Sequence, residues 1–168
     1  NPTFSHHKLT AFEYADGINN TVLTGTSDLQ QYYFKVFYAY YDDSGNVTTI
    51  AGSQTIAPYR WYHVAMVREG NNFRSYVNGV LDAEHTDSDD IRVGDGPCSI
   101  GRCIGYISNM RIVKGTAVYT SNFTPPTEPL TAITNTKLLC CNSSTTTGST
   151  VTPDTISAAG DPTASNTN

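Results

Sequence analysis

An Asn-Gly pair at positions 78 and 79 constrains the fold of this 168-residue chain more than any other feature. Both central positions of a type I′ hairpin turn need a positive φ, which Asn and Gly accept, and the twist of this turn matches the flanking strands. The pair lies inside RWYHVAMVREGNNFRSYVNGVLDAEH, and a second turn is expected at Gly70 to Asn72. The stretch therefore predicts three antiparallel strands, at about residues 61 to 68, at 73 to 77 and after Gly79.

The aromatic stretch YYFKVFYAYY, residues 32 to 41, predicts a further hairpin. It runs into DDSGN, a typical turn composition, and continues as VTTIAGSQTI. Side chains alternate between the two faces of a strand. One face would hold Tyr32, Phe34, Val36, Tyr38 and Tyr40, and the other Tyr33, Lys35, Phe37, Ala39 and Tyr41. We expect the first set to supply the core, because Lys35 marks the second face as partly solvated.

The rest of the chain continues this pattern of short strands. Helical periodicity is nearly absent, and Gly, Asn, Asp or Pro interrupts the apolar runs every eight to twelve residues. The stretches CSIG, GYISNMRIVKG and NTKLLCC are further strand candidates. This spacing predicts an all-β sandwich.

Length and composition predict one main domain, over residues 1–142. An apolar content of 38% suffices for a buried core in a chain of this size. Residues 143–168 are rich in Ser and Thr, and only Val151 and Ile156 are large and apolar. We expect residues 143 to 152 to be a flexible connection and DTISAAG, residues 154 to 160, to be a last edge strand.

Charge and hydropathy exclude two classes of partner. Ten Lys and Arg against fifteen Asp and Glu give a formal charge of -5, and no window clusters basic residues. Nucleic acid is therefore not an expected partner, since phosphate attraction has no source. No apolar run approaches the roughly 20 residues that cross a bilayer, so membrane insertion is not expected either.

The four cysteines do not have the spacing of zinc ligands. Cys98 and Cys103 are separated by four residues, whereas Cys140 and Cys141 are adjacent. We expect no structural zinc. Neighbouring residues of a strand point to opposite faces, so one of Cys140 and Cys141 should face the core and the other should face outward.

Four motifs between residues 61 and 126 carry a family resemblance: WYHVA, YVNG, GYISNMRI and YTSNFTPP. Together they closely resemble concanavalin A-like, laminin G type domains, most nearly those in structural proteins of tailed bacteriophages, especially phages of marine cyanobacteria. The resemblance implies a two-layer antiparallel jelly-roll sandwich. Such domains serve as glycan binders, adhesion modules or building blocks.

The chain departs from this family in two places. Family members begin with a strand of the type DFTIEFWV, and residues 1 to 31 hold no good match. Either that strand lies outside this chain or the N-terminal part has diverged. The loop between CSIG and GYIS is also short, which would reduce a ligand site built there.

Two residues of the WYHVA motif have structural interpretations. Trp61 is expected to be a core anchor, because an indole buries a large surface. His63 is expected to be a hydrogen-bonded structural residue rather than a base, since the sequence places no nucleophile beside it.

The sequence predicts no enzyme. Glycoside hydrolases of this fold carry two carboxylates in a motif such as Glu-x-Asp-x-x-Glu, because acid and nucleophile must lie about 5 to 5.5 Å apart. No such motif occurs here. The acidic stretch DAEHTDSDD follows a hairpin and is interpreted as a solvated loop; its carboxylates are Asp82, Glu84, Asp87, Asp89 and Asp90.

Calcium is the one ion that the resemblance implies. Laminin G domains often hold it at a loop edge through Asp oxygens and backbone carbonyls, the hard ligands that calcium selects. One candidate set is Asp87, Asp89 and Asp90, and another is Asp42, Asp43 and Asn46. Plain turn residues are the favoured interpretation of both sets, since neither has the spacing of a complete calcium loop. Apart from calcium, no cofactor is expected.

A glycan site would use exposed rings near strand ends. Tyr40, Tyr41 and Tyr59 lie beside predicted turns and are the candidates. Most of the other rings are expected to pack in the core.

Three functions are compatible with the resemblance: two that involve no catalysis and, least favoured, a diverged glycoside hydrolase. The first is a non-enzymatic structural module of a phage virion, which contacts other virion proteins and the host surface, with a trimer as the expected homo-oligomer by analogy. The alternative is a carbohydrate-binding, lectin-like adhesion module for a cell-surface glycan.

Overall fold

The computed structural model describes residues 35–57, 60–91, 100, 106–152, 154–160 and 162–164. Every regular element within these residues is a β-strand, and every strand pair is antiparallel, which confirms the all-β class. The chain divides into two compact units, residues 1–103 and 104–168, and each is described by itself. In the described part of the chain, no helix has the length and apolar character needed to cross a bilayer.

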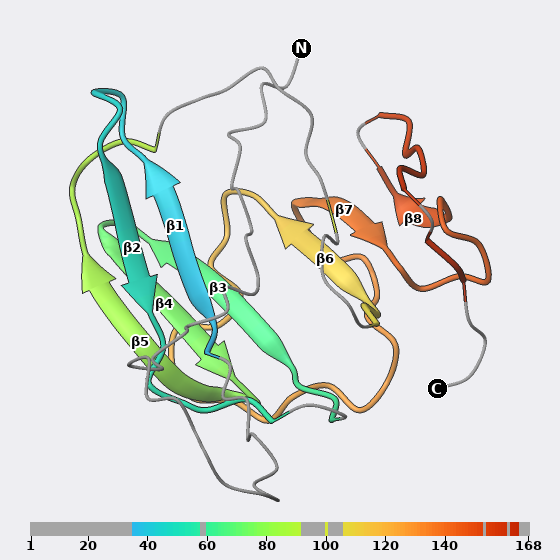
Figure 1. Cartoon of the computed structure of the whole chain (residues 1–168), viewed down its shortest axis with the longest axis horizontal. Helices are drawn as coiled ribbons and strands as arrows, with labels where there is room; N and C mark the ends of the chain where they lie inside the picture. The colour runs from blue at the N-terminus through green and yellow to red at the C-terminus, as the bar shows by residue number, and fades with distance from the viewer. Residues whose placement is uncertain are drawn as a thin grey trace, which may run out of the picture. The chain divides into compact units, whose positions relative to one another are not determined.

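Within its described residues, the first unit contains two sheets (Figure 1). Strands β1 (Phe37–Tyr41) and β2 (Val47–Ala51) form a hairpin, and β3 (Val64–Glu69), β4 (Asn72–Val77) and β5 (Val80–Thr86) form a three-stranded meander. The hairpins predicted around Gly70, Asn78-Gly79 and DDSGN are all present.

The two turns of the meander have the backbone angles that their residues favour. Asn78 has φ 51° and Gly79 has φ 78°, the pair of positive values that a type I′ turn needs. Gly70 alone is positive in the other turn, at φ 57°, as a type II′ turn requires at its first central position. The Asn78 turn is also tied to His63, because His63 N donates to Asn78 Oδ1 at 2.9 Å and Asn78 N donates to His63 O at 2.7 Å.

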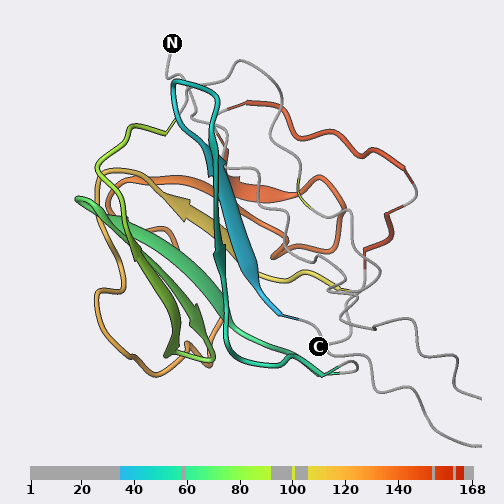
Figure 2. The ribbon, with the colours of Figure 1, turned by 60° about the vertical axis from the view of Figure 1, so that its left-hand side comes forward.

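The β1–β2 hairpin and the three-stranded sheet of the first unit lie against each other (Figure 2). Apolar side chains from both sheets pack together in the layer between them. The ring of Tyr40 stacks on Phe73 of β4, with centroids 4.7 Å apart and planes 7° apart. The predicted alternation is confirmed where the structure describes it, because Val36, Tyr38 and Tyr40 are buried while Lys35 and Tyr41 are exposed. The buried residues of this layer are Val36, Tyr38, Tyr40, Ile50, Ile56, Phe73 and Val77.

A β-bulge on β5 directs the side chain of Asp82 toward the segment after β2, where it stabilises the structure. The register passes from Ser75 opposite Ala83 to Tyr76 opposite Leu81, so Asp82 is the extra residue. A bulge re-aims a side chain. Here the Asp82 carboxylate lies 8% exposed and accepts bonds from Ser53 N at 2.8 Å, Gln54 N at 2.6 Å and Ser53 Oγ at 3.1 Å.

Gly52 is needed next to this carboxylate. A Cβ at Gly52 would lie 1.9 Å from Asp82 Oδ2 and 2.8 Å from the Val36 carbonyl oxygen. The Gly52 amide donates to that same carbonyl at 2.8 Å. Asp82 and Gly52 thus join the segment after β2 to both β5 and the residue before β1. The interpretation of Asp82 to Thr86 as solvated loop is therefore wrong, since these residues belong to a strand.

The expectation that Trp61 is a core anchor is wrong. Its side chain is 61% exposed, so it is not a core anchor in this structure. The reason is that strand pairing begins only at Val64, opposite Val77, and leaves Trp61 in the extended segment ahead of the sheet.

The part of the second unit that the structure describes contains one three-stranded sheet, in the order β6 (Met110–Val113), β7 (Thr136–Cys140) and β8 (Ser149–Val151). The strands expected in GYISNMRIVKG and NTKLLCC are present. The last strand lies at 149–151, within the segment expected to be a flexible connection, and the described residues 154 to 160 form no strand. That placement was wrong because Val151 pairs with Leu139, a contact that local composition does not reveal. CSIG lies outside the described residues except for Ile100.

We predict that Asp82→Ala lowers the free energy of unfolding by about 1–3 kcal/mol, because two backbone amides and a hydroxyl lose their acceptor. The buried Oδ2, which has no hydrogen-bond partner, limits the loss. Urea titration followed by circular dichroism measures the change. The control is Asp90→Ala at an exposed position, expected within about 0.5 kcal/mol of the parent chain. Equal losses in the two variants would contradict this role of Asp82.

Candidate functional site

One edge of the first unit gathers the carboxylates that the sequence singled out. The β1–β2 loop and the segment after β5 meet there through an antiparallel bridge between Asp42 and Ile91. We call the carboxylates of these two segments the acidic edge; they are Asp42, Asp43, Asp87, Asp89 and Asp90. The two candidate calcium sets, 40 or more residues apart in sequence, therefore belong to neighbouring loops.

Asp42 is engaged by its own loop. Its Oδ1 accepts a bond from Asn46 N at 2.8 Å and its Oδ2 accepts one from Asn46 Nδ2 at 2.7 Å. The loop closes with Gly45 at φ 87°, a conformation that glycine adopts readily. The hydrogen bonds from Asn46 hold the pKa of Asp42 below its ordinary value. Both carboxylate oxygens thus stabilise the turn.

Asp87 is likewise engaged, by the core tyrosine and by its own loop. The Tyr40 hydroxyl donates to Asp87 Oδ2, and the Asp89 amide donates to Oδ1 at 2.8 Å. The bond from Tyr40 is the main cause that lowers the pKa of Asp87. Burial, followed by the bond to Asp87, raises the pKa of Tyr40 to about 12. Tyr40 therefore stays protonated and remains a donor at neutral pH.

Arg68, a residue that the sequence analysis did not single out, connects this edge to the core. Its Nη2 donates to the Asp89 carbonyl at 3.0 Å and its Nε donates to the Gly70 carbonyl at 3.0 Å. Its guanidinium carbon lies 4.8 Å from the centroid of the Phe73 ring, a cation–π distance. Phe73 stacks on Tyr40, so Arg68, Phe73, Tyr40 and Asp87 form one connected set. The one sequence signal for this role is the position of Arg68 in the strand VAMVRE, where alternation places it on the same face as Val64 and Met66.

The calcium prediction stays a prediction. Within the described residues, no three His, Cys, Asp or Glu side chains are arranged to hold a metal ion. Asp87 of the first candidate set and Asp42 of the second have their oxygens in protein hydrogen bonds. Asp43, Asp89 and Asp90 are exposed and are the side chains of the acidic edge that could turn toward a cation.

The three candidate glycan residues have different environments. Tyr40 is 1% exposed, so its ring has no face to offer and the prediction was wrong for this residue. It failed because alternation directs Tyr40 inward even beside a turn. Tyr41 is 46% exposed and lies opposite Val47, which is also exposed. Tyr59 lies outside the described residues.

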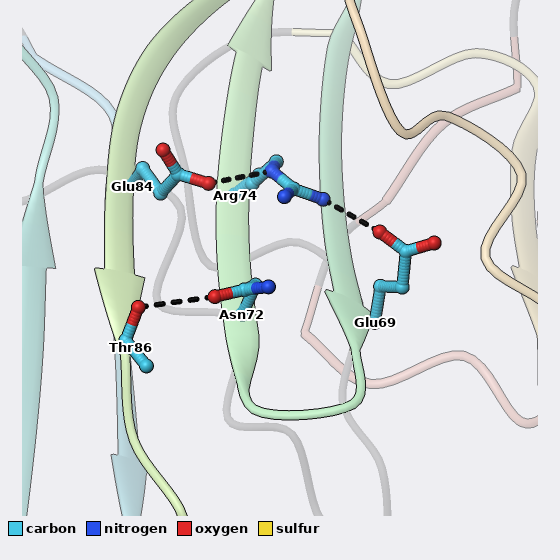
Figure 3. Close-up of polar contacts among 5 residues, drawn as sticks. All are labelled: Glu69, Asn72, Arg74, Glu84 and Thr86. Carbon is cyan, nitrogen blue, oxygen red and sulfur yellow. Dashed lines mark hydrogen bonds and ion pairs between the residues drawn. The ribbon is translucent and has the colours of Figure 1, made fainter.

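Two glutamates of the three-stranded sheet are joined by an arginine (Figure 3). Arg74 of β4 binds Glu69 of β3 through Nη1 at 2.8 Å and Glu84 of β5 through Nε at 2.7 Å. These bonds raise the pKa of Arg74, the Glu69 bond being the larger cause. Asn72 and Thr86 form a further cross-strand bond at 3.0 Å. Glu69 and Glu84 therefore serve cross-strand pairing, with a cation between them.

Comparison with known proteins identifies the family. The family model described as concanavalin A-like lectin/glucanases superfamily, of laminin G type, matches residues 6–127. The chain belongs to this family. No curated protein and no solved structure gave a significant match.

Membership agrees with the antiparallel, all-β architecture, which is that of a concanavalin A-like β-sandwich. Laminin G-like domains can be carbohydrate-binding or structural. The family match begins at residue 6, so it includes most of the N-terminal part, whose structure lies outside the described residues.

We predict that the Tyr40–Asp87 bond makes stability depend on pH. The folded-state pKa of Asp87 lies below its ordinary 3.8, so its contribution is present above pH 3.8 and is lost as the pH falls through the folded-state pKa. Asp87→Asn should therefore unfold more easily than the parent at neutral pH, and this difference should shrink on acidification. Urea titrations across acid pH measure it.

Tyr40→Phe is the matched partner variant, since it removes the donor and leaves the stacked ring. Each of the two substitutions removes the same Tyr40–Asp87 hydrogen bond. The double variant should therefore lose less stability than the sum of the two single losses. Additive losses, or a difference that does not change with pH, would contradict the role of this bond.

Proposed function

We propose that this chain is a non-enzymatic laminin G-like module in the virion of a tailed bacteriophage, where it binds other virion proteins. The observation that carries the non-enzymatic part is the use of its carboxylates. Asp42, Asp82 and Asp87 accept bonds from backbone amides or Tyr40, and Glu69 and Glu84 flank Arg74. Such groups support the sheets rather than a glycosidic cleavage, which needs an acid and a nucleophile facing one bond.

The virion part rests on the sequence motifs WYHVA, YVNG, GYISNMRI and YTSNFTPP, which resemble those of phage structural proteins. An apolar surface on the β1–β2 hairpin supports a role in protein contacts, because contiguous exposed apolar groups mark interaction surfaces. Tyr41 and Val47 lie opposite each other there, and both are exposed. By family analogy the assembly is a homotrimer.

A second function, glycan binding on the host surface, is favoured by one observation. Tyr41 presents a half-exposed ring at the mouth of the β1–β2 loop, next to exposed Asp43. A ring face with polar groups beside it matches the apolar faces and hydroxyl groups of a sugar. In this proposal Asp43, Asp89 and Asp90 supply carboxylates for a calcium ion at the same edge.

The virion proposal is tested on particles. Antibodies raised against this chain should decorate intact virions of the encoding phage in electron micrographs, and tryptic peptides of the chain should be present in purified particles. Light scattering of the isolated chain should give the mass of a trimer. Abundance in infected cells together with absence from purified virions would contradict the proposal, as would turnover of a polysaccharide by the chain.

The glycan proposal is tested on an array of cell-surface glycans, with calcium and with a chelator. Tyr41→Ala should weaken binding at least about tenfold, equivalent to about 1.4 kcal/mol. The matched control is Tyr106→Ala, which removes a ring that is 77% exposed in the other unit and should leave binding unchanged. Equal effects of the two variants, or the absence of any glycan signal, would contradict a site at Tyr41.

A further inference from the structure

Two adjacent cysteines at the end of β7 hold their sulfur atoms on the same side. Adjacent side chains of a regular strand point to opposite faces. The sulfur atoms of Cys140 and Cys141 nevertheless lie only 3.8 Å apart. The strand ends at Cys140, and Cys141 adopts φ 57°, a left-handed conformation that is uncommon for a residue other than glycine.

The neighbouring strands hold this conformation. Cys140 pairs with Met110 of β6 on one side and with Ser149 of β8 on the other. The Cys141 carbonyl accepts a bond from Asn109 N at 2.8 Å, and Asn109 Oδ1 accepts one from Leu130 N at 3.0 Å. A sparsely populated backbone conformation persists only where its surroundings determine it, and it is common at functional positions.

The two thiols differ in access and acidity. Cys140 is 2% exposed, whereas Cys141 is partly exposed. The hydrogen bond from Cys140 lowers the pKa of the Cys141 thiol to about 7. A partly exposed thiol with a lowered pKa attacks disulfides readily, because the thiolate is the nucleophile. The buried thiol beside it is out of reach of a reagent but within reach of its neighbour.

We propose that Cys140 and Cys141 form a reactive vicinal dithiol that exchanges with small-molecule disulfides. The Cys141 thiolate attacks one sulfur of the external disulfide, forms a mixed disulfide and releases one thiolate. Cys140, after losing its proton to solvent, attacks the Cys141 sulfur and expels the second small thiol. The external disulfide is thereby reduced to two thiols, and the protein is oxidised by two electrons to a Cys140–Cys141 disulfide.

The product should be easily reduced. Adjacent Cα atoms are about 3.8 Å apart across a trans peptide, whereas disulfides usually join Cα atoms about 4.4–6.8 Å apart. The bond would therefore be strained, and strained disulfides are the labile ones. This site is independent of the proposed virion and glycan roles.

The experiment treats the folded, reduced full chain with oxidised glutathione at neutral pH, followed by acid quenching, alkylation, trypsin and mass spectrometry. No Lys or Arg follows Lys137, so one peptide, residues 138–168, holds both Cys140 and Cys141. Arg102 separates Cys98 and Cys103 into other peptides. The expected product is peptide 138–168 lighter by two hydrogen atoms, without alkyl groups, and restored by dithiothreitol.

Two variants separate the roles of the thiols. In the Cys140→Ser variant the reaction should stop at a glutathione adduct on Cys141, because the thiol that would displace glutathione is missing. Cys141→Ser should leave Cys140 unmodified on the same time scale, because burial excludes the reagent. Circular dichroism confirms that each variant is folded.

Comparison with the unfolded chain tests the geometry. The folded chain should oxidise at residues 140 and 141 at least about threefold faster than the chain in urea, where both thiols have ordinary pKa values and no backbone angle holds the two sulfur atoms on one side. Equal rates in the two states would overturn the proposal. Retention of both thiols in folded peptide 138–168, or modification of Cys140 in folded Cys141→Ser at the parental rate, would overturn it as well.

Discussion

The stack of Tyr40 on Phe73 is the interaction on which the first unit depends. The two rings join the β1–β2 hairpin to the three-stranded sheet across one apolar layer. The hydroxyl of the same tyrosine donates to Asp87, which directly follows β5. Arg68 lies over the ring of Phe73. A single aromatic contact therefore couples sheet packing to the position of the loop edge. A buried ring with a polar tip suits this position, because its body is apolar and its hydroxyl needs a partner.

Most of the carboxylates discussed above are held in place by hydrogen bonds or ion pairs within the protein. An Asp or Glu that accepts several protein hydrogen bonds is held in one orientation, as are Asp82 beside Ser53 and Asp87 beside Tyr40. Glu69 and Glu84 are held across strands by Arg74. These arrangements stabilise sheets and loops. Three carboxylates of the acidic edge, those of Asp43, Asp89 and Asp90, remain exposed, and the ring of Tyr41 in the same hairpin is half-exposed.

Local pattern predicted much of this fold, and its errors have identifiable causes. Alternation placed Tyr38 and Tyr40 inward and Tyr41 outward, and Asn78-Gly79 predicted its turn, because both signals act over a few residues. The glycan prediction is nonetheless wrong for Tyr40, because alternation directs its ring into the core even though the residue lies beside a turn. The exposure of Trp61 depends on where strand pairing begins, and the last strand depends on pairing with Leu139. Both depend on pairing between strands, which a local sequence pattern does not reveal.

The sequence by itself determined the all-β class, the three hairpins of the first unit, the family and the absence of a recognisable catalytic motif, because periodicity, turn chemistry and short motifs are local properties. Only the tertiary structure decided that Asp82 is a bulge residue bonded to the segment after β2, that Arg68 joins the acidic edge to Phe73, and that the sulfurs of Cys140 and Cys141 lie together. Each of these depends on strand register or on one unusual backbone angle, and both are set by partners distant in the chain.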